Sequence, residues 1–182
     1  RRPSRSGGSS SPAGPHGAWA REQLALHARH GLQAQWFADQ EWRVPKAQRR
    51  EYVLAYQEGA LPGHPAEADP VSAVMSARLE IDAEATYDFA VETAGRGTLV
   101  IDNRVVVREG RRAPGRRIEG AELLTRGAHD LTFVYRNPGG EADYRVWWRP
   151  PGKAWSILPL ERLTPTEDPR VGRLLDTLRA AK

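Results

Sequence analysis

The chain has 182 residues, a formal net charge of +4 and no cysteine. This length suits one domain of about 100–150 residues with appended segments. The lack of cysteine excludes disulfides, thiol nucleophiles and thiolate metal sites, and no apolar run is long enough to span a membrane. Arg1, Arg2 and Arg5 supply three of the four net charges, so the rest is nearly neutral and we expect no nucleic-acid partner.

The N-terminal region divides into a polar stretch and a short helix. Residues 1–17 contain no large apolar side chain, and their Gly, Ser and Pro content predicts a flexible linker. The arginines there could instead contact acidic lipid or a partner. Residues 18–30 predict a short helix that ends at Gly31. His27 and His30 share a spacing suited to a metal, but no third ligand is nearby, so we expect surface or helix-cap histidines.

A β-rich region follows the helix. Residues 32–42 alternate between apolar and polar side chains, which predicts a half-buried strand. Residues 45–70 are compatible with a helical turn or a strand followed by a loop, and both assignments stay open.

From residue 77 the pattern has a period of two. We expect one face to carry Leu79, Ile81 and Ala83, and the other to carry Glu80, Asp82 and Glu84. Three carboxylates on one strand face could hold a cation or act as acid and base. A solvated outer face of a β-sandwich is the simpler interpretation, and we favour it.

The segment TLVIDNRVVV (residues 98–107) predicts a hairpin. Its two β-branched runs flank Asp102–Asn103, residue types that tolerate the positive φ of a tight turn. A two-residue turn would place Ile101 opposite Arg104 and Leu99 opposite Val106.

An arginine-rich loop comes next, followed by two strands. The loop contains Arg108, Arg111, Arg112, Arg116 and Arg117. Their forked donors suit a carboxylate, sulfate or phosphate, but a solvated loop is the simpler interpretation, and we favour it. The strands HDLTFVY and ADYRVWW are joined by the turn NPGG.

The last segment, residues 166–182, predicts an amphipathic helix with Asp168 as its N-cap. Its apolar face is formed by Val171, Leu174, Leu175 and Leu178. The three leucines must be buried on this domain or on a partner. Residues 31–165 then form one all-β domain, an antiparallel β-sandwich or barrel with short flanking helices at both ends.

Three sequence motifs, in this order along the chain, resemble those of the PA-fourteen (PA14) domain family, the β-sandwich family named after the anthrax protective antigen. They are GLQAQWF (residues 31–37), TYDFAVETAGRGTLVIDNRVVV (residues 86–107) and GAHDLTFVYRNPGGEADYRVWWRPPGKAWSILPLERL (residues 127–163). The resemblance covers about Gly31 to Leu163. It implies a protective-antigen-type sandwich and a non-catalytic module.

One position departs from the family. Many sugar-binding members carry two consecutive aspartates that coordinate calcium in the loop before the hairpin. Aligned on residues 99–102, this chain has Ala94–Gly95 there, and calcium needs charged oxygen ligands. The resemblance therefore implies a module without the calcium-binding pair. Asp102 matches the hairpin aspartate of the family and is expected to be a turn residue.

Two tryptophans are the main candidates for binding. Trp147 and Trp148 are neighbours on a strand, so one faces inward and one outward. The family pattern matches Trp148 to a core tryptophan, which would expose Trp147. An exposed indole could stack on a sugar or anchor a protein interface, or it could be covered by a terminal segment. Trp155 has the same alternatives.

No known catalytic motif is present. His129 and Asp130 could suggest a base with its orienting acid, but neighbours on a strand point to opposite faces. We expect no enzyme, no cofactor and no metal. The expected function is a periplasmic or extracellular accessory subunit, tethered upstream of Arg1, that docks on a partner protein or membrane-associated complex. The alternatives are a calcium-independent carbohydrate-binding module and the terminal domain of a larger glycan-acting enzyme.

Overall fold

The computed structural model describes residues 22, 24–57, 59–60, 63–67, 70–108, 116–166 and 176. The linker predicted over residues 1–17 lies outside them, as does the helix predicted over residues 166–182 apart from residues 166 and 176. The described strands and two short 3-10 turns are β1 (Leu32–Phe37), β2 (Pro45–Glu51), β3 (Ala55–Gln57), η1 (Pro65–Glu67), β4 (Val71–Ile81), β5 (Ala85–Glu92), β6 (Arg96–Ile101), β7 (Arg104–Val107), β8 (Ile118–Leu124), β9 (Gly127–Asn137), β10 (Asp143–Arg149), β11 (Ser156–Ile157), η2 (Leu160–Arg162) and β12 (Leu163–Pro165).

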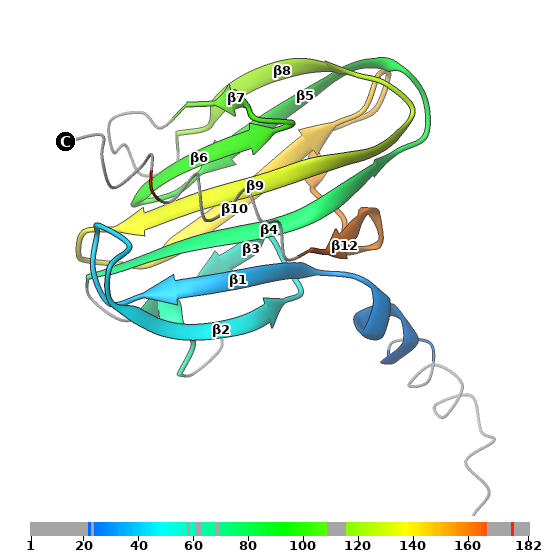
Figure 1. The fold of residues 1–182 in the computed structure, drawn as a ribbon. Coiled ribbons are helices and arrows are strands. Elements are labelled where there is room, and N and C mark those ends of the chain that lie inside the picture. Colours follow the sequence, from blue (N-terminus) through cyan, green and yellow to red (C-terminus); the bar gives the residue numbers. More distant parts are fainter. Residues whose placement is uncertain are drawn as a thin grey trace, which may run out of the picture.

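The strands form two antiparallel sheets packed face to face (Figure 1). The seven-stranded sheet has the order β2-β1-β4-β9-β6-β7, and β12 pairs with the second half of β4. The five-stranded sheet has the order β11-β10-β5-β8, and β3 pairs with β10. This architecture confirms the predicted all-β sandwich. No helix in the described part of the chain is long and apolar enough to cross a membrane.

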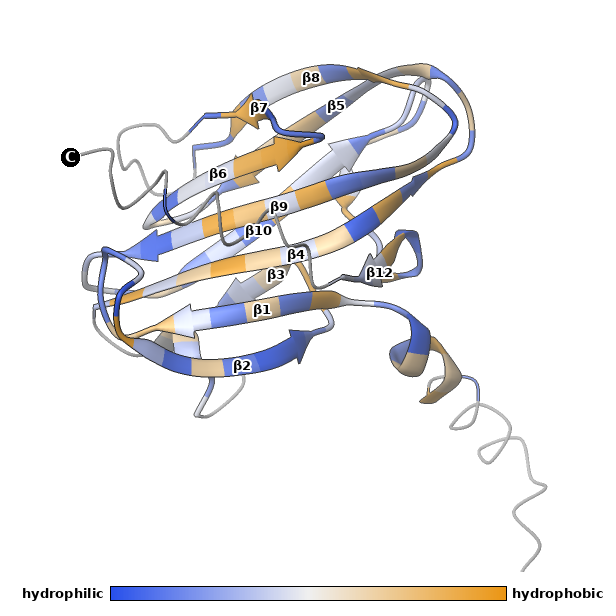
Figure 2. Cartoon of the chain, viewed as in Figure 1, coloured by the Kyte–Doolittle hydropathy of each residue, from blue (hydrophilic) through white to orange (hydrophobic). Residues whose placement is uncertain are grey.

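The core lies between the two sheets because alternate residues of the central strands point inward. Met75 and Leu79 of β4 and Phe133 and Tyr135 of β9 are 0% exposed. They pack against Phe89 of β5 and its neighbours in one continuous cluster. Figure 2 shows hydrophobic residues concentrated in the middle of β9 and hydrophobic bands along β4.

The first strand is shorter than predicted. β1 ends at Phe37, and residues 38–44 form a loop instead of the end of a strand. The reason is Asp39, whose carboxylate accepts hydrogen bonds from the backbone amides of Glu41, Arg43 and Val44. These amides then have no place in a sheet ladder. The loop turns Trp42 back onto the outer face of the seven-stranded sheet, where it is buried.

The turn between β4 and β5 corrects the predicted row of carboxylates. β4 ends at Ile81, so Asp82 and Glu84 lie in the turn and do not share a strand face with Glu80. Ala83 is exposed and does not join the core. Alternation places side chains only within a strand. It therefore fails for Asp82, Ala83 and Glu84, which follow the end of β4.

The predicted hairpin turn at Asp102–Asn103 is confirmed. Both residues have positive φ, of 48° and 67°, and Ile101 pairs with Arg104. The predicted pairing of Leu99 with Val106 is wrong, because a β-bulge shifts the register and Leu99 pairs with Val107. Such a bulge adds one residue on one strand and sharpens the local twist.

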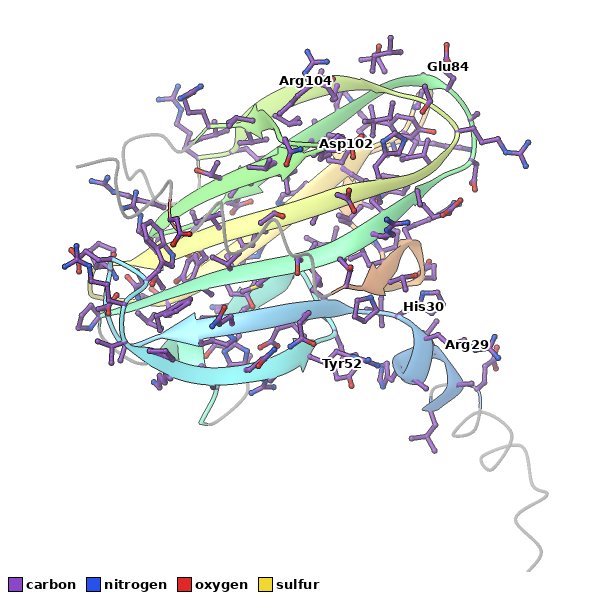
Figure 3. All side chains as sticks on the ribbon, viewed as in Figure 1. Arg29, His30, Tyr52, Glu84, Asp102 and Arg104 are labelled. Atoms are coloured by element: carbon purple, nitrogen blue, oxygen red, sulfur yellow. The ribbon has the colours of Figure 1, made fainter. Side chains whose placement is uncertain are left out.

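A short helical segment precedes the sandwich. Residues 24–29 are helical, and Gly31 begins the approach to β1 with a φ of 125°. The segment is held by His30, whose Nδ1 lies 3.2 Å from the carbonyl oxygen of Leu163, and by His27, whose ring contacts Tyr52. Figure 3 shows His30 beside the start of β1 and Tyr52 at the end of β2.

A polar cluster, formed by Trp36, Glu51 and His64, is buried beside the core. The Glu51 carboxylate accepts a hydrogen bond of 3.0 Å from Trp36 Nε1, and it lies 3.3 Å from His64 Nε2 and 3.1 Å from Arg49 Nε. The amide of Ala66 donates to His64 Nδ1, so Nε2 carries the proton that points at Glu51. We call these three residues the interior polar cluster.

Candidate functional site

Strand β10 separates its two tryptophans to opposite sides of the five-stranded sheet. Trp148 points into the sandwich, is 7% exposed and stacks with Tyr87 at a centroid distance of 6.0 Å. Trp147 points outward, where Ala90 of β5 and Ile157 of β11 are its neighbours in the sheet. This confirms the prediction that one tryptophan faces inward and the other outward. Trp147 is only half-buried rather than fully open.

Arginine side chains cover the outward indoles. The Arg117 guanidinium lies 4.0 Å from the ring centroid of Trp147 and 5.7 Å from that of Trp155. Arg149 lies 4.8 Å from the Trp155 ring. We call Arg117, Trp147, Arg149 and Trp155 the Trp–Arg face. A cation over an indole is attracted by the ring quadrupole, so each contact fixes a guanidinium above the sheet.

The arginines of this face differ in how their charge is balanced. Arg149 Nε donates a hydrogen bond of 2.9 Å to Asp88 Oδ2, and its Nη2 lies 2.8 Å from the same oxygen in an ion pair. Arg117 is 3.9 Å from Glu92, its nearest carboxylate among the described residues, which is too long for a hydrogen bond. The Arg117 side chain also makes no hydrogen bond with any described residue. It is therefore a positioned guanidinium whose N–H donors are not used within the described part of the chain.

Of the seven remaining predicted binding residues, the structure describes two. Arg108 and Arg116 are exposed at the two ends of the arginine-rich loop. The other five predicted residues lie outside the described ranges: Arg111, Arg112, Leu174, Leu175 and Leu178.

The loop aligned with the calcium-binding pair is held in place by hydrogen bonds to Asp143. The amide of Ala94 donates to the carboxylate of Asp143, and Thr93 Oγ1 donates to the Asp143 carbonyl at 2.6 Å. A Cβ placed on Gly95 would lie 2.2 Å from the carbonyl oxygen of Arg136. No group of three or more His, Asp or Glu side chains in the described ranges is arranged to hold a metal ion.

A pocket of about 170 Å³ lies at the end of the sandwich opposite the Ala94–Gly95 loop, and sequence reasoning missed it. Its lining includes Tyr87 and Trp148 from the core and a polar rim of Glu80, Asp82, Lys153 and Arg162. We call it the end pocket. The Arg162 Nη1 donates to Asp82 Oδ1 at 2.5 Å, and this hydrogen bond lowers the pKa of Asp82 and raises that of Arg162. Asp82 and Arg162 are 80 residues apart, so no local pattern pairs them.

Comparison with known proteins identifies the fold. No protein-family model matches the chain, and no curated protein matches its sequence. Among solved structures, an anti-sigma factor domain-containing protein from Clostridium clariflavum is similar with a TM-score of 0.67 and 21% identity, over 76% of this chain and 48% of that one. This chain thus spans about half the length of that protein.

Two further structures are PA14 domains. The PA14 domain of the MpAFP antifreeze protein has a TM-score of 0.61 at 12% identity and covers 76% of this chain and 93% of that one. The PA14 sugar-binding domain from an RTX adhesin has a TM-score of 0.60 at 18% identity, over 75% and 98% of the two chains. The chain therefore has a PA14-type β-sandwich fold, as its sequence motifs predicted.

Proposed function

We propose that this chain is a non-catalytic, extracytoplasmic carbohydrate-binding module that acts without calcium and recognises acidic glycans through the Trp–Arg face. The observation that carries the proposal is Arg117, held 4.0 Å above Trp147 with its N–H donors unused by described residues. A planar guanidinium suits the carboxylate of a uronic acid or a sulfate group. The adjacent indole edges of Trp147 and Trp155 supply apolar surface for a sugar ring.

Two further observations support this proposal. One similar structure is a domain described as sugar-binding. The loop at Ala94–Gly95 uses its backbone and Asp143 to close itself, and Gly95 leaves no room for a side chain beside the Arg136 carbonyl. Both findings agree with a sugar-binding surface that does not use the Ala94–Gly95 loop.

The non-catalytic part of the proposal is supported by the hydrogen bonds that occupy both ring nitrogens of His129 and of His64. His129 is bound through Nδ1 to Asp102 and through Nε2 to the Thr125 carbonyl, so neither ring nitrogen is left to accept a substrate proton. His64 is engaged at both nitrogens in the interior polar cluster. A general base needs a nitrogen within hydrogen-bond reach of the substrate.

The experiment is binding to immobilised polygalacturonate, with and without EDTA. We expect retention that EDTA does not change, and at least about a tenfold loss of affinity in Arg117→Gln, because a charge-assisted contact contributes about 1.5–3 kcal/mol. Arg104→Gln is the matched control, since Arg104 is an exposed arginine on β7 of the other sheet. Absence of binding, loss with EDTA, or an equal effect of both variants would overturn the proposal.

A second candidate is docking, as an accessory subunit, on a protein or membrane-associated complex. It is favoured by the composition of the same face, because Trp and Arg dominate the energetics of protein interfaces. If this role is the true one, the intact chain retains a defined protein complex from cell envelopes, Arg117→Gln and Trp155→Ala release it, and polygalacturonate does not compete. If the module instead belongs to a larger glycan-acting enzyme, its gene continues upstream of Arg1 into a catalytic domain.

A further inference from the structure

The end pocket has chemistry different from that of the Trp–Arg face. Its floor contains Tyr87 and Trp148, whose rings are nearly parallel at 14°. The polar ends of both floor residues are already engaged, since Tyr87 Oη donates to the Ala83 carbonyl and Trp148 Nε1 donates to Ser156 Oγ. Tyr87 is 5% exposed and Trp148 is 7% exposed, so the small part of each ring that reaches the pocket offers apolar contact rather than hydrogen bonds.

The rim of the end pocket is polar and electrically balanced. Two carboxylates, Glu80 and Asp82, face two cations, Lys153 and Arg162. Asp82 is 69% exposed and Arg162 is 31% exposed, so both keep surface that a ligand can reach while they bond to each other. A balanced rim gives no net attraction for an anion or a cation. It does place strong acceptors beside strong donors.

We infer that the end pocket is a second binding site, one that takes a single neutral sugar ring. A hydroxyl group both donates and accepts hydrogen bonds. Two adjacent hydroxyls can therefore donate to Asp82 and accept from Arg162 or Lys153 at the same time. The less polar face of a pyranose then contacts the exposed parts of Tyr87 and Trp148.

The size of the pocket agrees with one ring. Its volume of about 170 Å³ is far more than one water requires, and it is smaller than the pockets of about 300 Å³ and above that hold drug-sized ligands. The site lies beyond the C-terminal end of β4. Ala94–Gly95 instead follow the C-terminal end of β5, the next strand along the chain, which belongs to the other sheet. The inference stands whether or not the Trp–Arg face binds acidic glycans.

The test is an NMR titration of the full chain with methyl β-D-galactopyranoside, methyl β-D-glucopyranoside and methyl α-D-mannopyranoside. The reporter is the indole Nε1–H signal of Trp148, because this residue lines the pocket. We expect at least one pyranoside to shift it with a dissociation constant on the order of 1–10 mM, which is typical of a few hydrogen bonds and one apolar contact. Asp82→Asn is expected to weaken binding about tenfold.

Glu84→Gln is the matched control. Glu84 is an exposed carboxylate two residues from Asp82, and Figure 3 shows it at the tip of the β4–β5 turn. We expect this variant to bind like the wild type. Lys153→Met is a second pocket variant on an exposed turn, so its effect is separable from folding.

Three results would overturn the inference: no pyranoside shifts the Trp148 signal, Glu84→Gln weakens binding as much as Asp82→Asn, or inorganic phosphate shifts the signal where the pyranosides do not. Polygalacturonate binding, measured in parallel, separates this inference from the proposed function. Asp82→Asn should leave that binding unchanged, and Arg117→Gln should leave the pyranoside titration unchanged.

Discussion

The interior polar cluster and the Trp–Arg face use similar residue types in opposite ways. In the interior, the Glu51 carboxylate lies within 3.3 Å of a donor on each of Trp36, Arg49 and His64. On the outer face, Arg117 is 3.9 Å from its nearest described carboxylate. A buried charge left without partners costs several kcal/mol, whereas a charge at the surface remains hydrated. Burial therefore demands complete pairing, and partial exposure leaves donors for a ligand.

The largest effect is expected at Glu51. Glu51→Ala leaves Trp36 Nε1 and His64 Nε2 without their acceptor in a site where the Glu51 side chain is 4% exposed. We expect the free energy of unfolding to fall by about 3 kcal/mol, measured by urea denaturation. Glu84→Ala on the exposed turn is the control and should change it by less than about 0.5 kcal/mol. Equal effects would show that the interior pairing has no special role.

The second effect concerns close backbone packing at Gly95. In Gly95→Ala the new Cβ would lie 2.2 Å from the Arg136 carbonyl oxygen, so the backbone of β9 must shift. We expect a loss of about 2 kcal/mol, within the range for overpacked sites. Thermal unfolding followed by circular dichroism measures it. Gly127→Ala would serve poorly as a control because its φ of 123° is itself strained for alanine, so the wild type is the reference.

A smaller effect distinguishes two arginines of the Trp–Arg face. Arg149→Gln removes a hydrogen-bonded ion pair with Asp88 and should cost about 0.5–1 kcal/mol, since both side chains are over a third exposed. Arg117→Gln loses a cation–π contact but no side-chain hydrogen bond to a described residue, so it should cost about 0.5 kcal/mol while it weakens glycan binding at least about tenfold. Urea denaturation of both variants gives the comparison. A larger stability loss at Arg117 would mean that its donors serve the fold.

The smallest effect is a pH dependence at the hairpin. Burial lowers the pKa of His129, but the hydrogen bond to Asp102 and that to the Thr125 carbonyl outweigh it, and the pKa is raised. A raised folded-state pKa stabilises the protein below the unfolded value of about 6.5, and the contribution disappears as the pH rises through the folded pKa. The free energy of unfolding should therefore fall slightly above about pH 6.5. Asp102→Asn should reduce that fall, and an unchanged slope would contradict the assignment.

The strands and the hairpin were predictable because their signals are local. Asp102–Asn103 fixes a turn through backbone conformation, and the alternation in residues 143–149 separates Trp147 from Trp148. The short first strand was not predictable from alternation, because Asp39 captures amides that a strand would use. The bulge opposite Leu99 was not predictable for a different reason. Alternation with a period of two carries no information about an inserted residue.

The sites were predictable only in part. Trp147, Trp155 and Arg117 were singled out as separate candidates, and the structure brings them together. Their contact depends on β8 and β10 lying on either side of β5, an order that no residue spacing encodes. The end pocket depends on a contact between Asp82 and Arg162, which lie 80 residues apart in the sequence. Long-range juxtaposition of this kind requires the fold before the site can be seen.

Strand β2 has a consequence for how these modules behave at high concentration. It forms the outer edge of the seven-stranded sheet, where one side of a strand can pair with the backbone of another molecule. Its sequence begins with Pro45, which lacks an amide donor, and carries Lys46, Arg49 and Arg50 along a largely hydrophilic ribbon (Figure 2). Two molecules that meet at this edge would repel each other before their strands could align. The edge thus favours dispersed copies over fibrous aggregates.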